Sequence, residues 1–219
     1  MKGNFARDVM QEHILTNIFH DMFFTEYLDK KCGYKSYLID YNKEPEKQLK
    51  GIDVVVENSK NQTVNIDLKC QTNKYINNPT STFCIEVSYI HKKIDKKGWF
   101  VSKNMETDYY LFIWIHRADC DDFVLERDEL KDVEFMLVKK EDIKNYLLAN
   151  GFNDDGLLEQ AQRMRKCNIK KEIVNNIRFV CSTYLPEQPV NVVIPKHEYK
   201  RMPQTKHYFF EHNKMVQMS

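Results

Sequence analysis

The chain has 219 residues, of which 42% are hydrophobic, 30% charged and 12% aromatic, with six glycines and six prolines. This composition excludes a disordered or collagen-like chain and is that of an ordinary globular protein. The formal net charge of +1 gives no overall attraction to a polyanion. The length predicts one domain, with a core over about residues 5–150 and a C-terminal extension over residues 151–219. A small separate unit from about residue 152 onward stays open.

The six cysteines and the N-terminal segment bear on compartment and metal chemistry. None of the cysteines forms a C-x-x-C pair, which gives no support to a structural zinc site. Their apolar neighbours are typical of buried thiols in a reducing compartment. No apolar signal region opens the sequence, and no run reaches ~18 apolar residues. We therefore expect a cytoplasmic protein with no membrane partner.

Hydrophobic periodicity predicts the elements in chain order. Residues 5–31 should form one long helix, because apolar side chains recur at helical spacing and Gly33 follows its end. Strands are expected at 34–39, 52–57, 63–71, 82–89, 108–116 and 133–138, helices at 139–150 and 156–166, and short strands at 177–182 and 190–194. Residues 199–219 give no clear pattern. The fold class is α/β or α+β, with a mixed central sheet flanked by helices.

The two strands at 52–57 and 63–71 form a predicted hairpin whose register follows from its alternation. If the hairpin is symmetric about Lys60, Val54 lies opposite Ile66 and Val56 opposite Val64, which gives one continuous apolar face. The same register places Ile52 opposite Leu68.

On the polar face of this hairpin, Asp53 lies directly opposite Asp67, and Lys69 projects from the same side. Carboxylates on cross-strand neighbours repel each other and require compensation. A divalent cation such as Mg²⁺, or Mn²⁺, would supply it and could activate water for phosphoryl chemistry. Lys69 would then orient the water or neutralise charge in the transition state.

The residues Gly51-Ile52-Asp53, then a hairpin, then Asp67-Leu68-Lys69 resemble the core motif of the PD-(D/E)XK nuclease superfamily. That superfamily includes many restriction endonucleases and Holliday-junction resolvases, and the resemblance covers roughly residues 5–116. It implies a restriction-endonuclease-like core in which Asp53 and Asp67 bind Mg²⁺ and Lys69 assists the water. Gln71 resembles a polar position that some branches keep after the lysine.

The chain departs from the family pattern at two positions, and one ligand is left open. Ile52 stands where proline is common, and Asp67 stands where glutamate is more usual. Members often add an acid from the first helix, for which Glu12, Asp21 and Glu26 compete. Asp21 is taken as the third metal ligand, because it lies about one helical turn from residues that should face the core.

A lysine-rich loop over residues 91–103 is the expected contact with DNA phosphates. Lysines neutralise phosphates without reading sequence. Arg117, at the end of the strand over 108–116, could act in the same way. The residues of this predicted DNA contact are Lys92, Lys93, Lys96, Lys97 and Arg117.

The sequence therefore predicts a Mg²⁺-dependent nuclease that hydrolyses DNA phosphodiester bonds. The alternative is a catalytically inactive module that keeps the nuclease fold and binds DNA or a protein partner. The sequence leaves open the substrate's shape, endonuclease or exonuclease action, and the oligomeric state, for which a homodimer is one option.

Overall fold

The computed structural model describes residues 5–212 and 214–218, and the chain divides into two compact units. Unit 1 comprises Met1–Thr80, Glu106–Lys140 and Gln204–Ser219, and unit 2 comprises Ser81–Met105 and Glu141–Pro203. Both units combine strands with helices, which confirms the mixed class that the sequence predicts. None of the helices that the structure describes is long and apolar enough to span a membrane.

Unit 1 is built on a seven-stranded sheet in the order β1-β2-β3-β6-β7-β11-β12. Its strands are β1 (Lys35–Leu38), β2 (Val54–Glu57), β3 (Thr63–Cys70), β6 (Tyr109–Ala118), β7 (Leu130–Lys139), β11 (Lys206–Glu211) and β12 (Lys214–Gln217). The β3–β6 pair is parallel and the other recorded pairs are antiparallel. A parallel pair needs a long crossover, and the crossover from β3 to β6 carries the first segment of unit 2.

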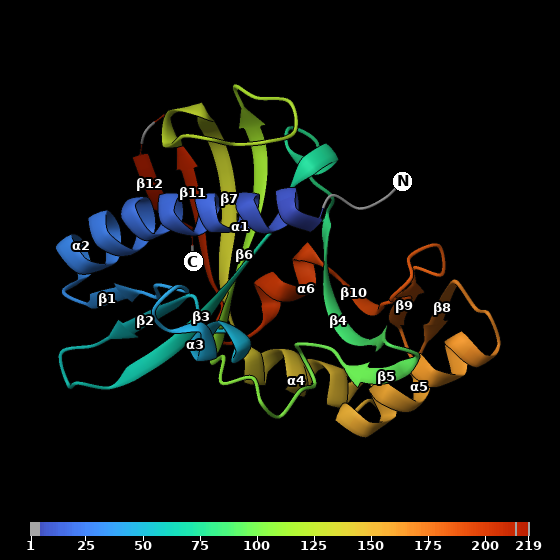
Figure 1. Ribbon diagram of the computed structural model, residues 1–219. Coiled ribbons are helices and arrows are strands. Elements are labelled where there is room, and N and C mark those ends of the chain that lie inside the picture. The colour runs from blue at the N-terminus through green and yellow to red at the C-terminus, as the bar shows by residue number, and fades with distance from the viewer. Residues whose placement is uncertain (1–4, 213, 219) are drawn as a thin grey trace. The chain divides into compact units, whose positions relative to one another are not determined.

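A continuous helical segment covers one face of this sheet, where Figure 1 shows α1 running across the strands. It consists of α1 (Phe5–Phe19), the π-helical η1 (His20–Asp29) and α2 (Lys30–Cys32), and it ends at Gly33 with φ of +71°. The predicted helix over 5–31 and its glycine end therefore agree with the structure. Its apolar side chains pack on those of the sheet in one buried cluster that includes Leu15, Phe19 and Phe23.

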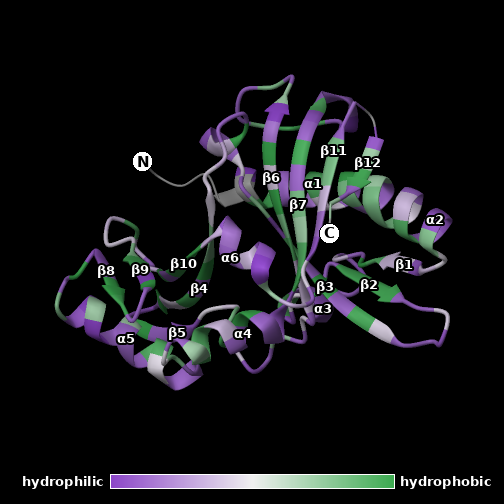
Figure 2. Cartoon of the chain, turned by 180° about the vertical axis from the view of Figure 1, so that it is seen from behind, coloured by the Kyte–Doolittle hydropathy of each residue, from purple (hydrophilic) through white to green (hydrophobic). Residues whose placement is uncertain are grey.

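Strand β6 is buried on both faces, as its sequence predicts for a central strand. Leu111, Ile113 and Ile115 belong to the cluster under the helix, while Phe112 and Trp114 point the other way and are also fully buried. Figure 2 shows the hydrophobic bands along β6 and β7. The shorter helices of unit 1 are α3 (Pro45–Leu49), η2 (Asn73–Tyr75) and η3 (Arg127–Glu129).

Unit 2 is built on a five-stranded antiparallel sheet in the order β5-β4-β10-β9-β8. Its strands are β4 (Thr82–His91), β5 (Ile94–Lys97), β8 (Lys171–Val174), β9 (Ile177–Cys181) and β10 (Val190–Pro195). Its helices are α4 (Lys140–Ala149), α5 (Asp154–Lys166) and α6 (Lys196–Arg201). Helix α5 contacts β4 and β9, and its N-cap Asn153 accepts a hydrogen bond from Gly156 N.

The structure differs from the sequence expectations in two places within unit 2. The segment after residue 151, which the sequence left open as a separate unit, shares a sheet with an earlier part of the chain, because β10 pairs with β4, a strand about a hundred residues earlier. The lysine-rich loop is in part a hairpin, since β5 pairs with β4 across a turn at Lys92 and Lys93. Both turn residues have positive φ, of 50° and 65°. Such turns usually carry Asn-Gly, so the Lys-Lys pair gave no signal for one.

Candidate active site

The hairpin of β2 and β3 has the register that its alternation predicts. Val54 pairs with Ile66, Val55 with Asn65, and Val56 with Val64. The backbone N–H of Asp53 donates to the carbonyl of Ile66 at 2.9 Å, which carries the pairing to the start of the motif. The ladder ends at Val54 and Ile66, so the predicted pairs of Asp53 with Asp67 and of Ile52 with Leu68 are not part of it. A side chain takes the place of the next backbone acceptor.

That side chain is Asp53, which is 6% exposed. Its Oδ2 accepts a hydrogen bond from the backbone N–H of Leu68 at 2.6 Å. Its Oδ1 accepts a hydrogen bond from the hydroxyl of Tyr41. The backbone N–H of Leu68 holds the carboxylate against β3, so the strand that carries Asp67 and Lys69 also orients Asp53.

Asp67 and Lys69 project from β3 on the side opposite to the buried cluster, and they form an ion pair. Asp67 is 2% exposed, and its Oδ1 lies 2.6 Å from Lys69 Nζ. The same ammonium lies 3.6 Å from Oε1 of Glu12 on α1. Lys69 therefore bridges an acid of the strand and an acid of the helix.

The structure separates the three acids that compete on the first helix. Glu12 faces Lys69 with a half-exposed side chain. Asp21 has a 76% exposed side chain and pairs with His20 at 3.5 Å, and it lies more than two turns further along the helix. Glu26 accepts two hydrogen bonds from Arg127 at 2.6 and 2.8 Å. Of these three, Glu12 is the acid that the structure brings to Asp67 and Lys69.

The electrostatics of the cluster follow from burial and from an excess of carboxylates. Burial and the nearby Asp53 raise the pKa of Asp67, against the effect of Lys69. Burial alone would lower the pKa of Lys69, but Asp67, Glu12 and Asp53 outweigh it and raise that pKa. Lys69 therefore stays protonated. Burial and the charge of Asp53 also raise the pKa of Tyr41, which keeps its hydroxyl as a donor.

Two further contacts hold the ends of the motif. Gly51 has φ of +68°, a conformation that side chains disfavour, and its carbonyl accepts a hydrogen bond from Thr107 Oγ1 at 2.7 Å. Gln71 bonds Thr80 twice, with its Nε2 2.7 Å from Thr80 Oγ1 and its Oε1 2.8 Å from Thr80 N. The amide of Gln71 thus ties the end of β3 to the following loop.

The acids of this cluster have the oxygen donors that Mg²⁺ and Mn²⁺ prefer. Lys69 is the ammonium that Glu12 and Asp67 share, and burial, with the nearby charge of Asp53, keeps the pKa of Asp67 raised despite it. Among residues 5–212 and 214–218, however, no three side chains of His, Cys, Asp or Glu are placed to hold a metal ion as they stand. A cation on these acids would compete with Lys69 for Asp67 and with Tyr41 for Asp53.

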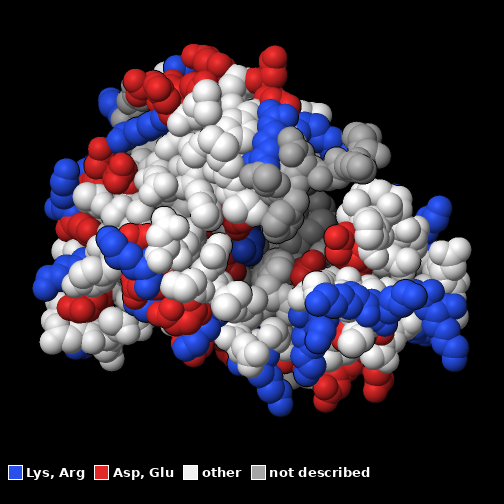
Figure 3. Space-filling model, viewed as in Figure 1, with Lys and Arg blue, Asp and Glu red and all other residues white. Residues whose placement is uncertain are grey.

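The predicted DNA-contact residues lie in both units. The four hairpin lysines, Lys92, Lys93, Lys96 and Lys97, are exposed, and Figure 3 shows basic side chains gathered over the part of the surface where β5 lies. Arg165 of α5, with a 7% exposed side chain, holds the hairpin through Asp95 at 2.6 Å and Ser88 Oγ at 2.7 Å. Arg117 belongs to unit 1, where it pairs with Asp132 at 3.0 Å.

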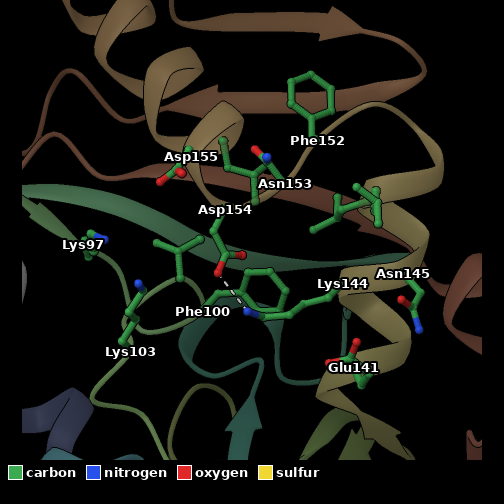
Figure 4. A pocket seen from close by; sticks show the side chains of 14 residues that line it. Lys97, Phe100, Lys103, Glu141, Lys144, Asn145, Phe152, Asn153, Asp154 and Asp155 are labelled. Atoms are coloured by element: carbon green, nitrogen blue, oxygen red, sulfur yellow. Dashed lines mark hydrogen bonds and ion pairs between the residues drawn. The ribbon is translucent and has the colours of Figure 1, made fainter.

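Lys97 also lines a cavity of about 370 Å³ in unit 2 (Figure 4). Phe100 is one of its lining residues, and an ion pair of 2.8 Å joins two others, Lys144 and Asp154. Lysines and acids line it together, so its wall lacks the uniform positive charge of a phosphate site.

A second buried polar cluster, in unit 1, has no counterpart among the sequence predictions. Glu134 of β7 is 4% exposed and accepts hydrogen bonds from His116 on β6 at 2.9 Å and from His207 on β11 at 2.8 Å. The three strands are neighbours in the sheet. The pairing of β11 with β7 brings His207 to this carboxylate, and local sequence gave no signal of that pairing.

Comparison with known proteins adds no assignment: no family model, no curated protein and no solved structure matches this chain.

Proposed function

We propose that this chain is a metal-dependent nuclease that hydrolyses phosphodiester bonds of DNA. One observation carries the proposal: Lys69 bridges Asp67 of the hairpin and Glu12 of the helix, and Asp53 is bonded to the backbone N–H of Leu68, which lies between Asp67 and Lys69. We propose that an acid from a third element, Glu12, completes the motif that the sequence offers as a pattern on two strands. In this proposal Glu12 replaces Asp21 as the helix ligand.

In this proposal, Asp53, Asp67 and Glu12 would hold Mg²⁺ or Mn²⁺, which when bound makes a coordinated water more acidic and polarises a phosphate oxygen. Hydrolysis joins a water oxygen to phosphorus and breaks one P–O ester bond; the water loses a proton and the leaving oxygen gains one. The protonated Lys69 is suited to neutralise charge on the phosphate oxygens. Its raised pKa makes it a poor general base.

The exposed lysines of the β4–β5 hairpin fit a role in holding the DNA backbone. The buried Arg165 favours this role, because it restrains the hairpin that carries them. Such contacts would be independent of sequence.

The test is cleavage of labelled linear, circular and branched DNA with Mg²⁺, with Mn²⁺ and with chelator alone. We expect cleavage only with a divalent ion, and its loss in Asp67→Asn and Lys69→Ala. Asp21→Asn is the matched control, because Asp21 is an exposed acid of the same helical segment and contacts His20 rather than the cluster. Full activity in chelator, or in Asp67→Asn, would contradict the proposal.

The second candidate is an inactive nuclease-fold module that binds DNA or a protein. The closed ion pair of Asp67 with Lys69, and the lack of a finished three-ligand group among the described residues, favour it. This candidate predicts DNA binding that survives Asp67→Asn, with no cleavage under any metal condition.

A further inference from the structure

A cavity of about 350 Å³ lies beside the candidate active site in unit 1. It is lined by His13, Thr16 and Asn17 of α1, by Leu38 at the end of β1 and by residues 39–42 that follow it. This volume is at the lower end of the ~300–1,000 Å³ typical of small-ligand sites. It suits a single small ring system and is too small for a base pair within a duplex.

The cavity shares one side chain with the candidate active site. Tyr41 lines the cavity, and its hydroxyl donates to Oδ1 of Asp53. The side chain of Tyr41 therefore lies between a ligand in the cavity and the acid that we propose as a metal ligand.

The wall offers aromatic rings and no cationic group. The rings of His13 and Tyr41 lie with their centroids 4.7 Å apart and tilted by 36°. Among the described residues that line the cavity, none is lysine or arginine. Aromatic faces of this kind stack on nucleobases of any sequence, whereas phosphates are held by cations. The wall thus favours a base over a phosphate.

Several polar groups around the cavity have unused hydrogen-bonding capacity. The buried Nε2 of His13 has no hydrogen-bond partner among the described residues. Asn17 donates from Nδ2 to the carbonyl of His13 at 2.9 Å, which leaves its Oδ1 as an acceptor. Asn42 donates its backbone N–H to Asp40 Oδ1 at 3.0 Å, and its exposed side-chain amide makes no hydrogen bond among the described residues. Amides of this type bond the edges of bases.

We propose that this cavity binds one unpaired nucleobase of the strand that is cut, stacked on the His13–Tyr41 wall and held at its edge by Asn17 and Asn42. The proposal rests on the proposed function and adds that the substrate has a single-stranded or flipped nucleotide next to the scissile phosphate. A free deoxynucleoside offers the same base and could also fill the cavity. The experiment below distinguishes a base within the DNA strand from a free nucleoside.

The first arm is an abasic scan. Single-stranded oligonucleotides of one sequence, each with an abasic residue at one position, are cut with Mg²⁺ by the full chain. We expect one position near the cut where loss of the base lowers kcat/KM about tenfold, the size of one base–aromatic contact. In Asn17→Ala/Asn42→Ala, the intact substrate should be cut about 3–10-fold more slowly, and the abasic penalty at that position should shrink. Gln48→Ala, an exposed amide on α3 outside the cavity, is the matched control and should keep the full penalty.

The second arm titrates the four deoxynucleosides into the wild-type chain and follows the imidazole NMR signals of His13. If DNA is cut but no position shows a penalty that depends on Asn17 and Asn42, the base site is wrong while the nuclease stands. If DNA is not cut but a nucleoside shifts the His13 signals in wild type and not in the double variant, the base site stands and the nuclease fails. No cleavage together with no shift overturns both.

Discussion

Replacing Asp67 by asparagine gives the most direct test of the charge balance at the hairpin. Three effects compete in the metal-free protein. The substitution removes a carboxylate that is 2% exposed, removes its repulsion with Asp53, and takes from Lys69 its partner at 2.6 Å. The first two effects stabilise the variant and the third destabilises it. The pKa of Asp67 is raised despite Lys69, so the stabilising effects should win.

The size of the gain should depend on pH. The pKa of Asp67 rises from 3.8 to about 8 in the folded protein. A group with a raised folded pKa contributes stability at low pH and loses it as pH rises through the folded value. Metal-free wild type should therefore lose stability relative to Asp67→Asn between about pH 4 and 8, by at most about 1.4 kcal/mol per pH unit. We expect Asp67→Asn to be more stable than wild type by about 1–3 kcal/mol at pH 8. This gain is smaller than that slope summed from about pH 4 to 8, because Lys69 loses its nearest partner in the variant.

The assay is the melting temperature in chelator from pH 5 to 8.5. A gain of about 1–3 kcal/mol corresponds to roughly 3–10 °C for a chain of this size. Asp21→Asn, which removes an exposed acid, should show no growing difference from wild type. In 10 mM Mg²⁺, wild type should gain about 3–6 °C if the dissociation constant is near ~1 mM, and Asp67→Asn should lose most of that gain. The reasoning is refuted if Asp67→Asn melts below wild type at pH 8, or if their difference stays constant with pH.

Four other predictions concern the site and its surroundings. Lys69→Ala should lose cleavage and keep the Mg²⁺-dependent rise in melting temperature, since its ammonium is not a ligand. Glu12→Gln should reduce that rise, whereas Glu26→Gln should not, because Glu26 is engaged with Arg127. Alanine at all four hairpin lysines should weaken DNA binding on every sequence. The slope of log affinity against log salt should become shallower by about one unit for each phosphate that the variant no longer neutralises. An unchanged slope would exclude a role of these lysines in holding phosphates. Gly51→Ala should lower the melting temperature by roughly 2–8 °C, because φ at this position is +68° and a side chain in that conformation costs about 1–2 kcal/mol. An unchanged melting temperature would show that alanine adopts this backbone conformation without strain.

The hairpin could be predicted because its information is local. Apolar residues alternate on both strands, and only one register buries them on a common face, so the pairing of Val54 with Ile66 follows without knowledge of the rest of the fold. The observed ladder is two pairs shorter than alternation predicts: Asp53 does not pair with Asp67 in it, nor Ile52 with Leu68. The N–H of Leu68 bonds the carboxylate of Asp53 instead. A polar side chain at the end of a strand can replace a backbone acceptor, and an argument from alternation does not detect this.

The helix acid could not be chosen from the sequence, because the helical phase changes along the segment. From His20 to Asp29 the helix is π-helical, and its turns are wider than those of the preceding α-helix. A helical wheel of constant period therefore loses the true direction of Asp21 and Glu26. Glu12 lies before this change, in the regular part of α1, yet the wheel alone gives no reason to prefer it.

Tyr41 was missed for a different reason, although the need for a hydrogen-bond donor at Asp53 follows from the sequence. A buried carboxylate needs hydrogen-bond donors for both oxygens. The sequence predicted that Asp53 would face the strand of Asp67, and one oxygen meets a backbone N–H there. The second oxygen required a donor from outside the hairpin. The segment that follows β1 supplies it, because β1 pairs with β2 and the backbone of Ile39 bonds the carbonyl of Asp53 at 2.9 Å. The requirement for a donor could thus be read from the sequence, but its identity depends on the pairing of β1 with β2. This pairing also places the His13–Tyr41 wall beside the acids, so the candidate base site depends on the same contact.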